Sequence, residues 1–196
     1  MKLTLPGGPA CGHATEVAAA YSAPSLFNHS LRVYAWAAAL GEVHEVGFDA
    51  ELLYVAAMLH DVGLAAEFDS HTKPFEVAGG HVAWVFAAGA GWPPERRARL
   101  AEVIVRHMWA EVDPAADPEG FLLSRAAAAD IAGRDVAALP ESFRAEVLER
   151  YPRLDLVEEF LRCFGDQAAR KPESAAAAAM RNDLATRMAA NPLERS

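Results

Sequence analysis

The chain has 196 residues, enough for one domain with a substantial hydrophobic core but too few for two comfortable ones. Its formal net charge of -9 argues against a nucleic-acid partner, because binding to a nucleic-acid backbone needs a positive surface. The two cysteines form no CxxC motif, no stretch resembles a signal peptide, and no run approaches the roughly 20 apolar residues of a membrane span. We therefore expect a cytoplasmic protein without a membrane partner.

The first third of the chain predicts helices separated by Gly and Pro breaks. Residues 1–14 are expected to be irregular, with a short helix over 15–21 and a longer one over 25–46 that carries an apolar stripe at helical spacing. Asp49 is a suitable N-cap for the next helix, which is strongly apolar. This helix ends on the pair His60-Asp61, directly before Val62 and Gly63.

The remainder continues as helices. Pro74 opens a helix over 75–88 that contains His81, and the next helix opens at residues 93–95. There, His107 follows Leu100 at i+7, which places it on the buried face. Further helices are expected over 120–131, 140–150, 154–164 and 173–190, and we interpret the alanine-rich last one as a surface helix of high propensity. Without a strand pattern, the fold class is all-α, a bundle of irregularly crossing helices.

Several of these helices carry metal-ligand types among alanines and leucines, where ionisable groups are costly to bury unless they are paired or metal-bound. His29, His60, Asp61 and Asp130 form a mixed imidazole and carboxylate set that suits a divalent metal, with zinc preferred and iron or manganese as alternatives. Such a metal would lower the pKa of a bound water from about 15.7 towards 7. His81 and His107 could complete a second metal site, or act as general acid/base groups and substrate contacts.

At these residues the sequence resembles the HD superfamily of metal-dependent hydrolases, whose pattern is a His, a His-Asp pair and a distant Asp on helices. The match spans about residues 25–135. The strings LFNHSLRVY (26–34), LHDVG (59–63) and FEVAGG (75–80) are similar to the cyanamide-hydratase-like branch, as are residues 104–107 and 151–153. We expect one HD-type domain over 1–196, with a core of about 22–170 and a tail over 173–196.

The resemblance implies one metal held by His29, His60, Asp61 and Asp130, and hydration of a small nitrile- or amide-like substrate, as from cyanamide to urea. It places His107 in the active site, and either His107 or Glu76 would transfer protons. His81 departs from that branch, whereas dinuclear HD phosphohydrolases use extra histidines in this stretch. The metal count therefore stays open, and we favour one.

Three functions follow from this interpretation. The first is a metal-dependent hydratase or hydrolase of a small molecule, with Asn28 as a substrate contact. The second is a phosphohydrolase of a nucleotide or phosphate ester, with Arg32 and Lys73 near the phosphate. The third is a catalytically silent binding module, which the intact ligand set disfavours. The sequence leaves the physiological substrate and the oligomeric state open, a homo-oligomer included.

Overall fold

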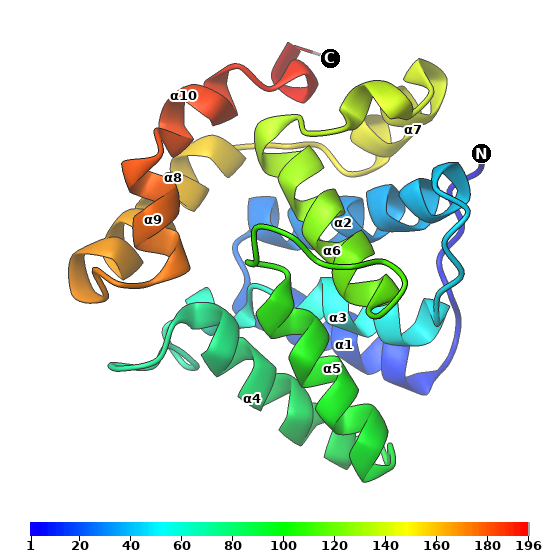
Figure 1. Cartoon of the computed structure of the whole chain (residues 1–196), viewed down its shortest axis with the longest axis vertical. Helices are drawn as coiled ribbons and strands as arrows, with labels where there is room; N and C mark the ends of the chain where they lie inside the picture. Colours follow the sequence, from blue (N-terminus) through cyan, green and yellow to red (C-terminus); the bar gives the residue numbers. More distant parts are fainter. Residues whose placement is uncertain (196) are drawn as a thin grey trace.

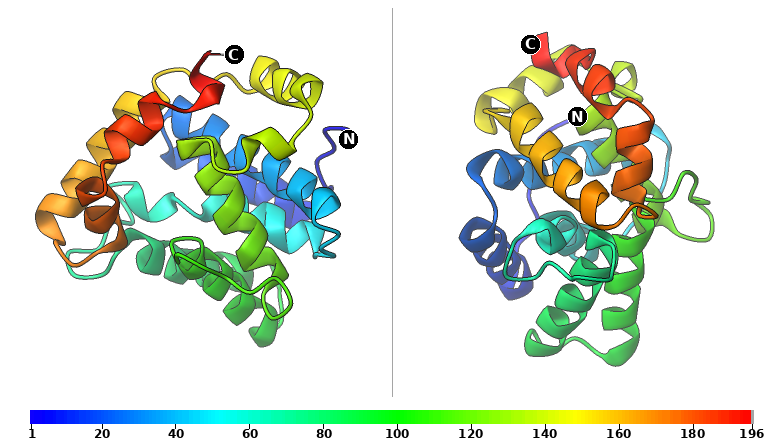
Figure 2. Two further views of the ribbon diagram at one scale, coloured as in Figure 1. Left: turned by 45° about the horizontal axis from the view of Figure 1, so that its top comes forward. Right: turned by 90° about the vertical axis from the view of Figure 1, so that its left-hand side faces the viewer.

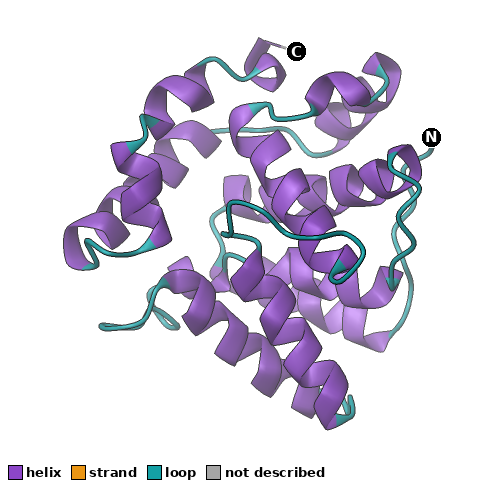
Figure 3. Cartoon of the chain, in the orientation of Figure 1, coloured by secondary structure: helices purple, strands orange, loops and turns teal. Residues whose placement is uncertain are grey.

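The computed structural model describes residues 1–195, in which ten α-helices and three short 3₁₀-helices are present and strands are absent (Figures 1 and 3). This confirms the predicted all-α fold. The α-helices are α1 Pro9–Tyr21, α2 Pro24–Val43, α3 Ala50–Leu59, α4 Phe75–Gly89, α5 Pro94–Arg106, α6 Pro118–Ala132, α7 Glu141–Arg150, α8 Leu156–Arg170, α9 Ala175–Arg181 and α10 Leu184–Ala189. The 3₁₀-helices are η1 Val62–Leu64, η2 Val136–Ala138 and η3 Pro192–Arg195.

Helix α2 is the central helix, in contact with α1, α3, α6, α7 and α8. It is buried around most of its circumference, and alanines at 35, 37 and 39 allow its neighbours to approach closely. Trp36, which is 1% exposed, packs edge-on against Phe143 of α7. The polar side chains His29 and Arg32 lie on the same helix and are equally buried, so each needs a partner inside the protein.

A second hydrophobic cluster is built mainly by α8, α9 and α10, which lie side by side at one edge of the molecule (Figure 2). Phe160 and Phe164 of α8 stack on one another at a ring-centroid distance of 4.2 Å. They belong to the same cluster as Phe75 of α4 and Ile131 of α6. The C-terminal helices thus pack on the N-terminal ones through a small hydrophobic core of their own.

The turn after α3 brings the His-Asp pair against α4. As predicted, the Asp49 side chain caps α3 by accepting a hydrogen bond from the backbone N–H of Leu52. The helix ends at Leu59, and η1 follows directly after Asp61. A Cβ atom at Gly63 would lie 2.1 Å from the carbonyl oxygen of Phe75, so only glycine lets η1 pack directly on the backbone of α4.

Two expectations about the elements are wrong. Helix α1 begins at Pro9, inside the stretch expected to be irregular, because Ala10, Cys11 and Ala14 pack into the core. The helix expected over 173–190 is two helices, divided at Asp183, whose φ of 56° is left-handed. Within residues 1–195, none of the helices is both long and apolar enough to cross a membrane.

Candidate metal centre

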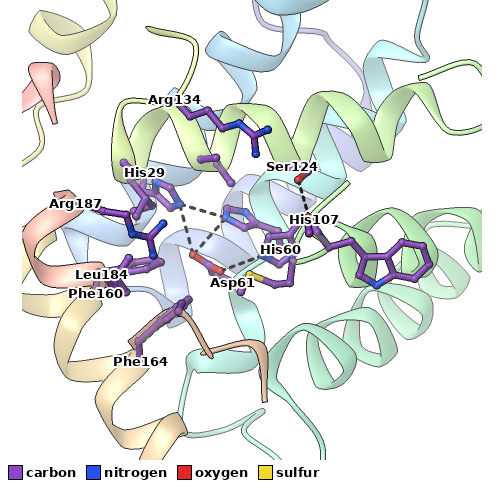
Figure 4. Close-up of a pocket in the computed structure, with 18 residues that line it drawn as sticks. His29, His60, Asp61, His107, Ser124, Arg134, Phe160, Phe164, Leu184 and Arg187 are labelled. Atoms are coloured by element: carbon purple, nitrogen blue, oxygen red, sulfur yellow. Dashed lines mark hydrogen bonds and ion pairs between the residues drawn. The ribbon is translucent and has the colours of Figure 1, made fainter. Parts of the chain in front are cut away.

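Three side chains meet where α2 and α3 cross. His29 comes from α2, His60 is the C-terminal cap of α3, and Asp61 follows it (Figure 4). The Nε2 atoms of the two histidines are 3.3 Å apart, and Asp61 Oδ2 lies 3.6 Å from the first and 3.3 Å from the second. All three side chains are less than a tenth exposed. We call His29, His60 and Asp61 the His-Asp cluster.

The proton positions on the imidazole rings follow from the hydrogen bonds of their Nδ1 atoms, which face away from the cluster. His29 Nδ1 lies 2.7 Å from a carboxylate oxygen of Asp130, and His60 Nδ1 lies 2.7 Å from the carbonyl oxygen of Ala57. Both partners only accept, so both Nδ1 atoms donate. In the neutral rings, each Nε2 then carries a lone pair directed into the cluster. His107 has the same arrangement, because its Nδ1 donates to the carbonyl oxygen of Ile104.

The donor set fits a divalent cation. Two imidazole lone pairs that face each other at 3.3 Å cannot hydrogen-bond without an additional proton, and Asp61 Oδ2 is buried without a hydrogen-bond partner. A cation would satisfy all three atoms at once. Nitrogen ligands with one carboxylate oxygen suit zinc and other first-row metals. The three ligand atoms lie within 4.8 Å of one another, and all three residues are buried.

The ionisation states agree with this arrangement. Burial lowers the pKa of His29, against the hydrogen bond to Asp130, so the ring is neutral at pH 7. The pKa of Asp61 lies well below its usual range, because the neighbouring histidines outweigh the effect of burial, which raises it. His60 behaves differently: although burial lowers its pKa, Asp61 raises it above the ordinary value. A bound cation would replace the proton that His60 and Asp61 otherwise share.

Asp130 lies behind His29 rather than within the His-Asp cluster. One oxygen accepts from His29 Nδ1 and from Arg32, and the other accepts from Arg32 and from the indole N–H of Trp36, the last three at 2.8 Å. The expectation that Asp130 is the fourth metal ligand is therefore corrected. The buried arginine and indole take up its oxygens, and the carboxylate orients the imidazole that would bind the metal.

Residues 26–126 match the family model of the HD domain, which includes the His-Asp cluster. The chain belongs to the HD-domain family. A search of curated proteins finds no match to the chain. HD domains bind divalent metals and are generally metal-dependent hydrolases, and the His-Asp cluster is a group of residues that could bind such a metal.

The cluster of this HD domain opens into a cavity of about 220 Å³. His107 stands beside the cluster at the cavity wall, with its Nε2 4.0 Å from Asp61 Oδ1. Burial and the neighbouring His60 lower its pKa to about 4, so it is neutral at pH 7. Much of the rest of the wall is apolar and comes largely from outside the matched region. Its larger members, which we call the apolar wall, are Met108, Ile131, Phe160, Phe164 and Leu184.

The other site residues expected from the sequence lie elsewhere. His81 is exposed on the outer face of α4, away from the cluster, and its expected catalytic or second-metal role is wrong. Arg32 is fully buried by its pairing with Asp130, so it cannot contact a substrate. Lys73 is exposed in the loop before α4, outside the cavity lining. Asn28 donates to the carbonyl oxygen of Pro152 and serves the fold instead.

Glu76 has an unpartnered carboxylate oxygen, as a catalytic residue could, but it does not line the cavity. Its side chain is buried and its Oε2 atom has no hydrogen-bond partner, but it is not part of the cavity lining. Burial raises its pKa, and the charge of Asp61 raises it further. A catalytic role for Glu76 therefore stays a prediction, and His107 is better placed for proton transfer.

Arg134 and Arg187 line the cavity and were missed by the sequence analysis. Arg134 follows Gly133, the left-handed cap of α6, and Arg187 lies on α10. In Figure 4 the Arg187 side chain points towards the His-Asp cluster, and the Arg134 side chain lies above the cluster, along α6. Exposed arginines near helix ends are common, and only the packing of α10 beside α6 and α8 places Arg187 at this cavity.

Proposed function

We propose that this chain adds water to a small nitrile- or amide-like substrate at a metal bound by His29, His60 and Asp61. The observation that carries the metal site is the pair of facing Nε2 lone pairs beside the unpartnered Asp61 Oδ2. When bound, a divalent metal supplies a Lewis acid and an activated water. The family match supports metal-dependent hydrolysis in general.

The choice of a small nitrile or amide rests on the cavity. Its volume of about 220 Å³ is below the range of drug-sized ligand pockets, and the apolar wall suits a compact organic group. A single metal is supported by the position of His81, whose exposure removes one of the additional ligands that a second metal would need. Hydration of a nitrile joins the water oxygen to the nitrile carbon, where it becomes the carbonyl oxygen, and moves both water protons to the nitrogen of the amide product.

His107 is the residue we assign to proton transfer. Its Nδ1 proton is held by Ile104, so its Nε2 lone pair is free to accept a proton from water and return it to the substrate nitrogen. Its position 4.0 Å from Asp61 places this lone pair next to the metal ligands. The apolar wall would exclude bulk water from the substrate, which strengthens polar interactions inside the cavity.

A phosphohydrolase is the second candidate, because Arg134 and Arg187 line the same cavity and arginines recognise phosphate oxygens. In that case the reacting phosphate would lie between the metal and the two guanidinium groups. The roles first expected for Arg32 and Lys73 do not apply, since one is buried and the other lies outside the cavity.

The test is metal analysis of the purified protein, followed by assay against cyanamide, small amides and a panel of phosphate esters. We expect about one metal ion per chain and release of urea or ammonia in preference to phosphate. His60→Ala should lose metal and activity together. His107→Ala should keep the metal and lose about 10²–10⁴-fold in rate. His81→Ala is the matched control and should keep both.

Two results would overturn this assignment. Efficient release of phosphate, without turnover of any nitrile or amide, would favour the second candidate. A metal ratio near two that falls on substitution of His81 would contradict the single-metal centre.

A further inference from the structure

The formally charged side chains that line the cavity carry a net positive charge, in a chain of net charge -9. Among the described residues that line it, Asp61 is the only carboxylate, and Arg134 and Arg187 are the only arginines or lysines. Asp61 would be neutralised by the cation it binds. The charges of the two arginines then remain. Both side chains are exposed, and their positive charge beside the cavity attracts an anionic ligand.

Neither arginine is engaged in a close ion pair within the described chain. The Nε atom of Arg134 is 3.9 Å from Asp135, whose carboxylate instead pairs with Arg125 at 2.7 Å. Arg187 has no carboxylate partner in residues 1–195, although acidic residues outnumber basic ones in the chain. Other arginines do find partners: Arg96, for example, pairs with both Asp49 and Glu51.

The two side chains approach the cavity from different elements. Arg134 comes from the end of α6, and Arg187 from α10, one turn after Leu184, which belongs to the apolar wall. In Figure 4 the guanidinium group of Arg187 points towards the His-Asp cluster, and that of Arg134 lies above the cluster; both side chains are exposed and line the cavity. A guanidinium group offers paired N–H donors that match the oxygens of a carboxylate or a phosphoryl group.

We propose that Arg134 and Arg187 bind an anionic group of the substrate, a carboxylate or phosphonate-like oxyanion, that takes no part in the reaction. The substrate then has three parts: the anionic end at the arginines, a short apolar part against Leu184 and Phe160, and the reacting nitrile or amide at the metal. This inference rests on the proposed function for the reacting end only. The anion site depends on the arginines and is separate from the His-Asp cluster.

Binding is tested first, without turnover. Propionate and methylphosphonate are titrated into the metal-loaded protein, with 1-propanol as the neutral control, and heat or the fluorescence of Trp109 at the cavity wall is followed. Arg134→Gln and Arg187→Gln should each weaken binding of the anions by about tenfold, the effect expected for loss of one charge-assisted contact. Comparison of the two anions shows whether the site prefers a carboxylate or a phosphoryl group.

Arg181→Gln is the matched control, because it removes the same charge from the neighbouring helix α9 but lies outside the cavity lining. It should leave both affinities unchanged. Arg187→Lys keeps the charge but loses the paired donors, so its affinity for the anions should lie between those of the wild type and Arg187→Gln. Equal anion affinity in the wild type and both Gln variants would overturn the proposal, since the anions would then bind at the metal or elsewhere.

Turnover separates this proposal from the proposed function. Cyanoacetate and cyanomethylphosphonate are compared with propionitrile, and the Gln variants should raise the KM of the anionic nitriles by a larger factor than that of propionitrile. If propionitrile and cyanoacetate are hydrated equally in all variants, the anion site is wrong and the hydratase stands. If the anions bind through the arginines but no nitrile or amide reacts, the anion site stands and the proposed hydratase function is wrong.

Discussion

The imidazole rings of this centre are fixed by hydrogen bonds of their Nδ1 atoms, which face away from the cavity. His29 is held by Asp130, His60 by the carbonyl of Ala57 and His107 by that of Ile104, so each ring keeps its Nε2 atom for the cavity. Two of these hydrogen-bond acceptors are backbone carbonyl groups one turn earlier in the chain, at the ends of α3 and α5. The helix ends therefore set both the position and the tautomer of the rings.

Asp130→Asn tests the role of Asp130 as the acceptor that fixes the His29 ring. The variant leaves Arg32 fully buried without a carboxylate, so we expect a loss of about 3–5 kcal/mol in the free energy of unfolding. Metal affinity should fall by about 10–100-fold, because His29 loses a charged acceptor but the ligand set stays complete. Chemical denaturation and competition with a chelator measure the two effects.

Absorption of the cobalt(II)-loaded protein provides the discriminating control. If Asp130 only orients His29, the ligand-field bands of Asp130→Asn should match those of the wild type, while Asp61→Asn should alter them. Equal changes in both variants would make Asp130 a metal ligand and contradict its position behind the ring.

The sequence identifies these residues with uneven success. His29, His60, Asp61 and His107 were found because ionisable side chains on apolar helices need a reason to be buried. His81 was misplaced because α4 has large apolar residues on its exposed face as well, among them Trp84 and Val85. The surroundings of Asp130 depend on α2, α6 and the turn near Tyr151 coming together, which no local pattern contains.

At the scale of elements, the junction between η1 and α4 carries the His-Asp pair, and its close contact depends on one glycine. Gly63→Ala would place a Cβ atom 2.1 Å from the carbonyl oxygen of Phe75 and 2.9 Å from the backbone nitrogen of Gly79. Since backbone atoms cannot yield as a side chain does, we expect a loss of about 3 kcal/mol or more in unfolding free energy. Metal affinity should fall as well, because Asp61 is two residues away. Urea denaturation and metal titration measure both.

Gly165→Ala is a suitable control, because Gly165 lies inside α8 with no atom within 4 Å of its added Cβ. That variant should be stabilised by up to about 1 kcal/mol, with unchanged metal affinity. If Gly63→Ala behaved in the same way, the close packing of η1 on α4 would not be needed for the site.

The elements themselves follow from the sequence better than their ends do. Asp49 as a cap and the helix start at residues 93–95 were recognised because each has a local physical cause. The break at Asp183 was not, because the alanine-rich stretch before it favours a helix and the left-handed residue is stabilised by the packing of α10. Tertiary contacts therefore decide where the last helix turns towards the cavity.

At the scale of the whole molecule, a polar cluster fastens α8 to the loop between η1 and α4. Asp69 accepts hydrogen bonds from Gln167 at 2.9 Å and from the buried Lys171 at 2.7 Å, and pairs with Arg170. Although burial raises the pKa of Asp69, these donors lower it below the ordinary value of 3.8. A lowered pKa in the folded state means that the carboxylate stabilises the fold above pH 3.8, and that this contribution is lost as the pH falls further.

Asp69→Asn should therefore be less stable than the wild type by about 1–2 kcal/mol at pH 7, since Lys171 loses its charged partner. The difference should persist down to about pH 4 and shrink below it. Urea midpoints measured at a series of pH values test this. A difference that is the same at pH 3 as at pH 7 would show that the Asp69 charge does not contribute.

The arrangement of the cavity has a consequence for how its selectivity can change. The three residues of the His-Asp cluster lie within the matched HD region, whereas Phe160, Phe164, Leu184 and Arg187 come from the stretch after it. The candidate metal ligands thus come from the matched region, and most of the cavity wall that would contact the substrate comes from the chain after it. Exchanging the last three helices for those of another HD protein would be expected to transplant substrate preference while the reactive machinery stays intact. Directed evolution of this scaffold should therefore begin at its C-terminal helices.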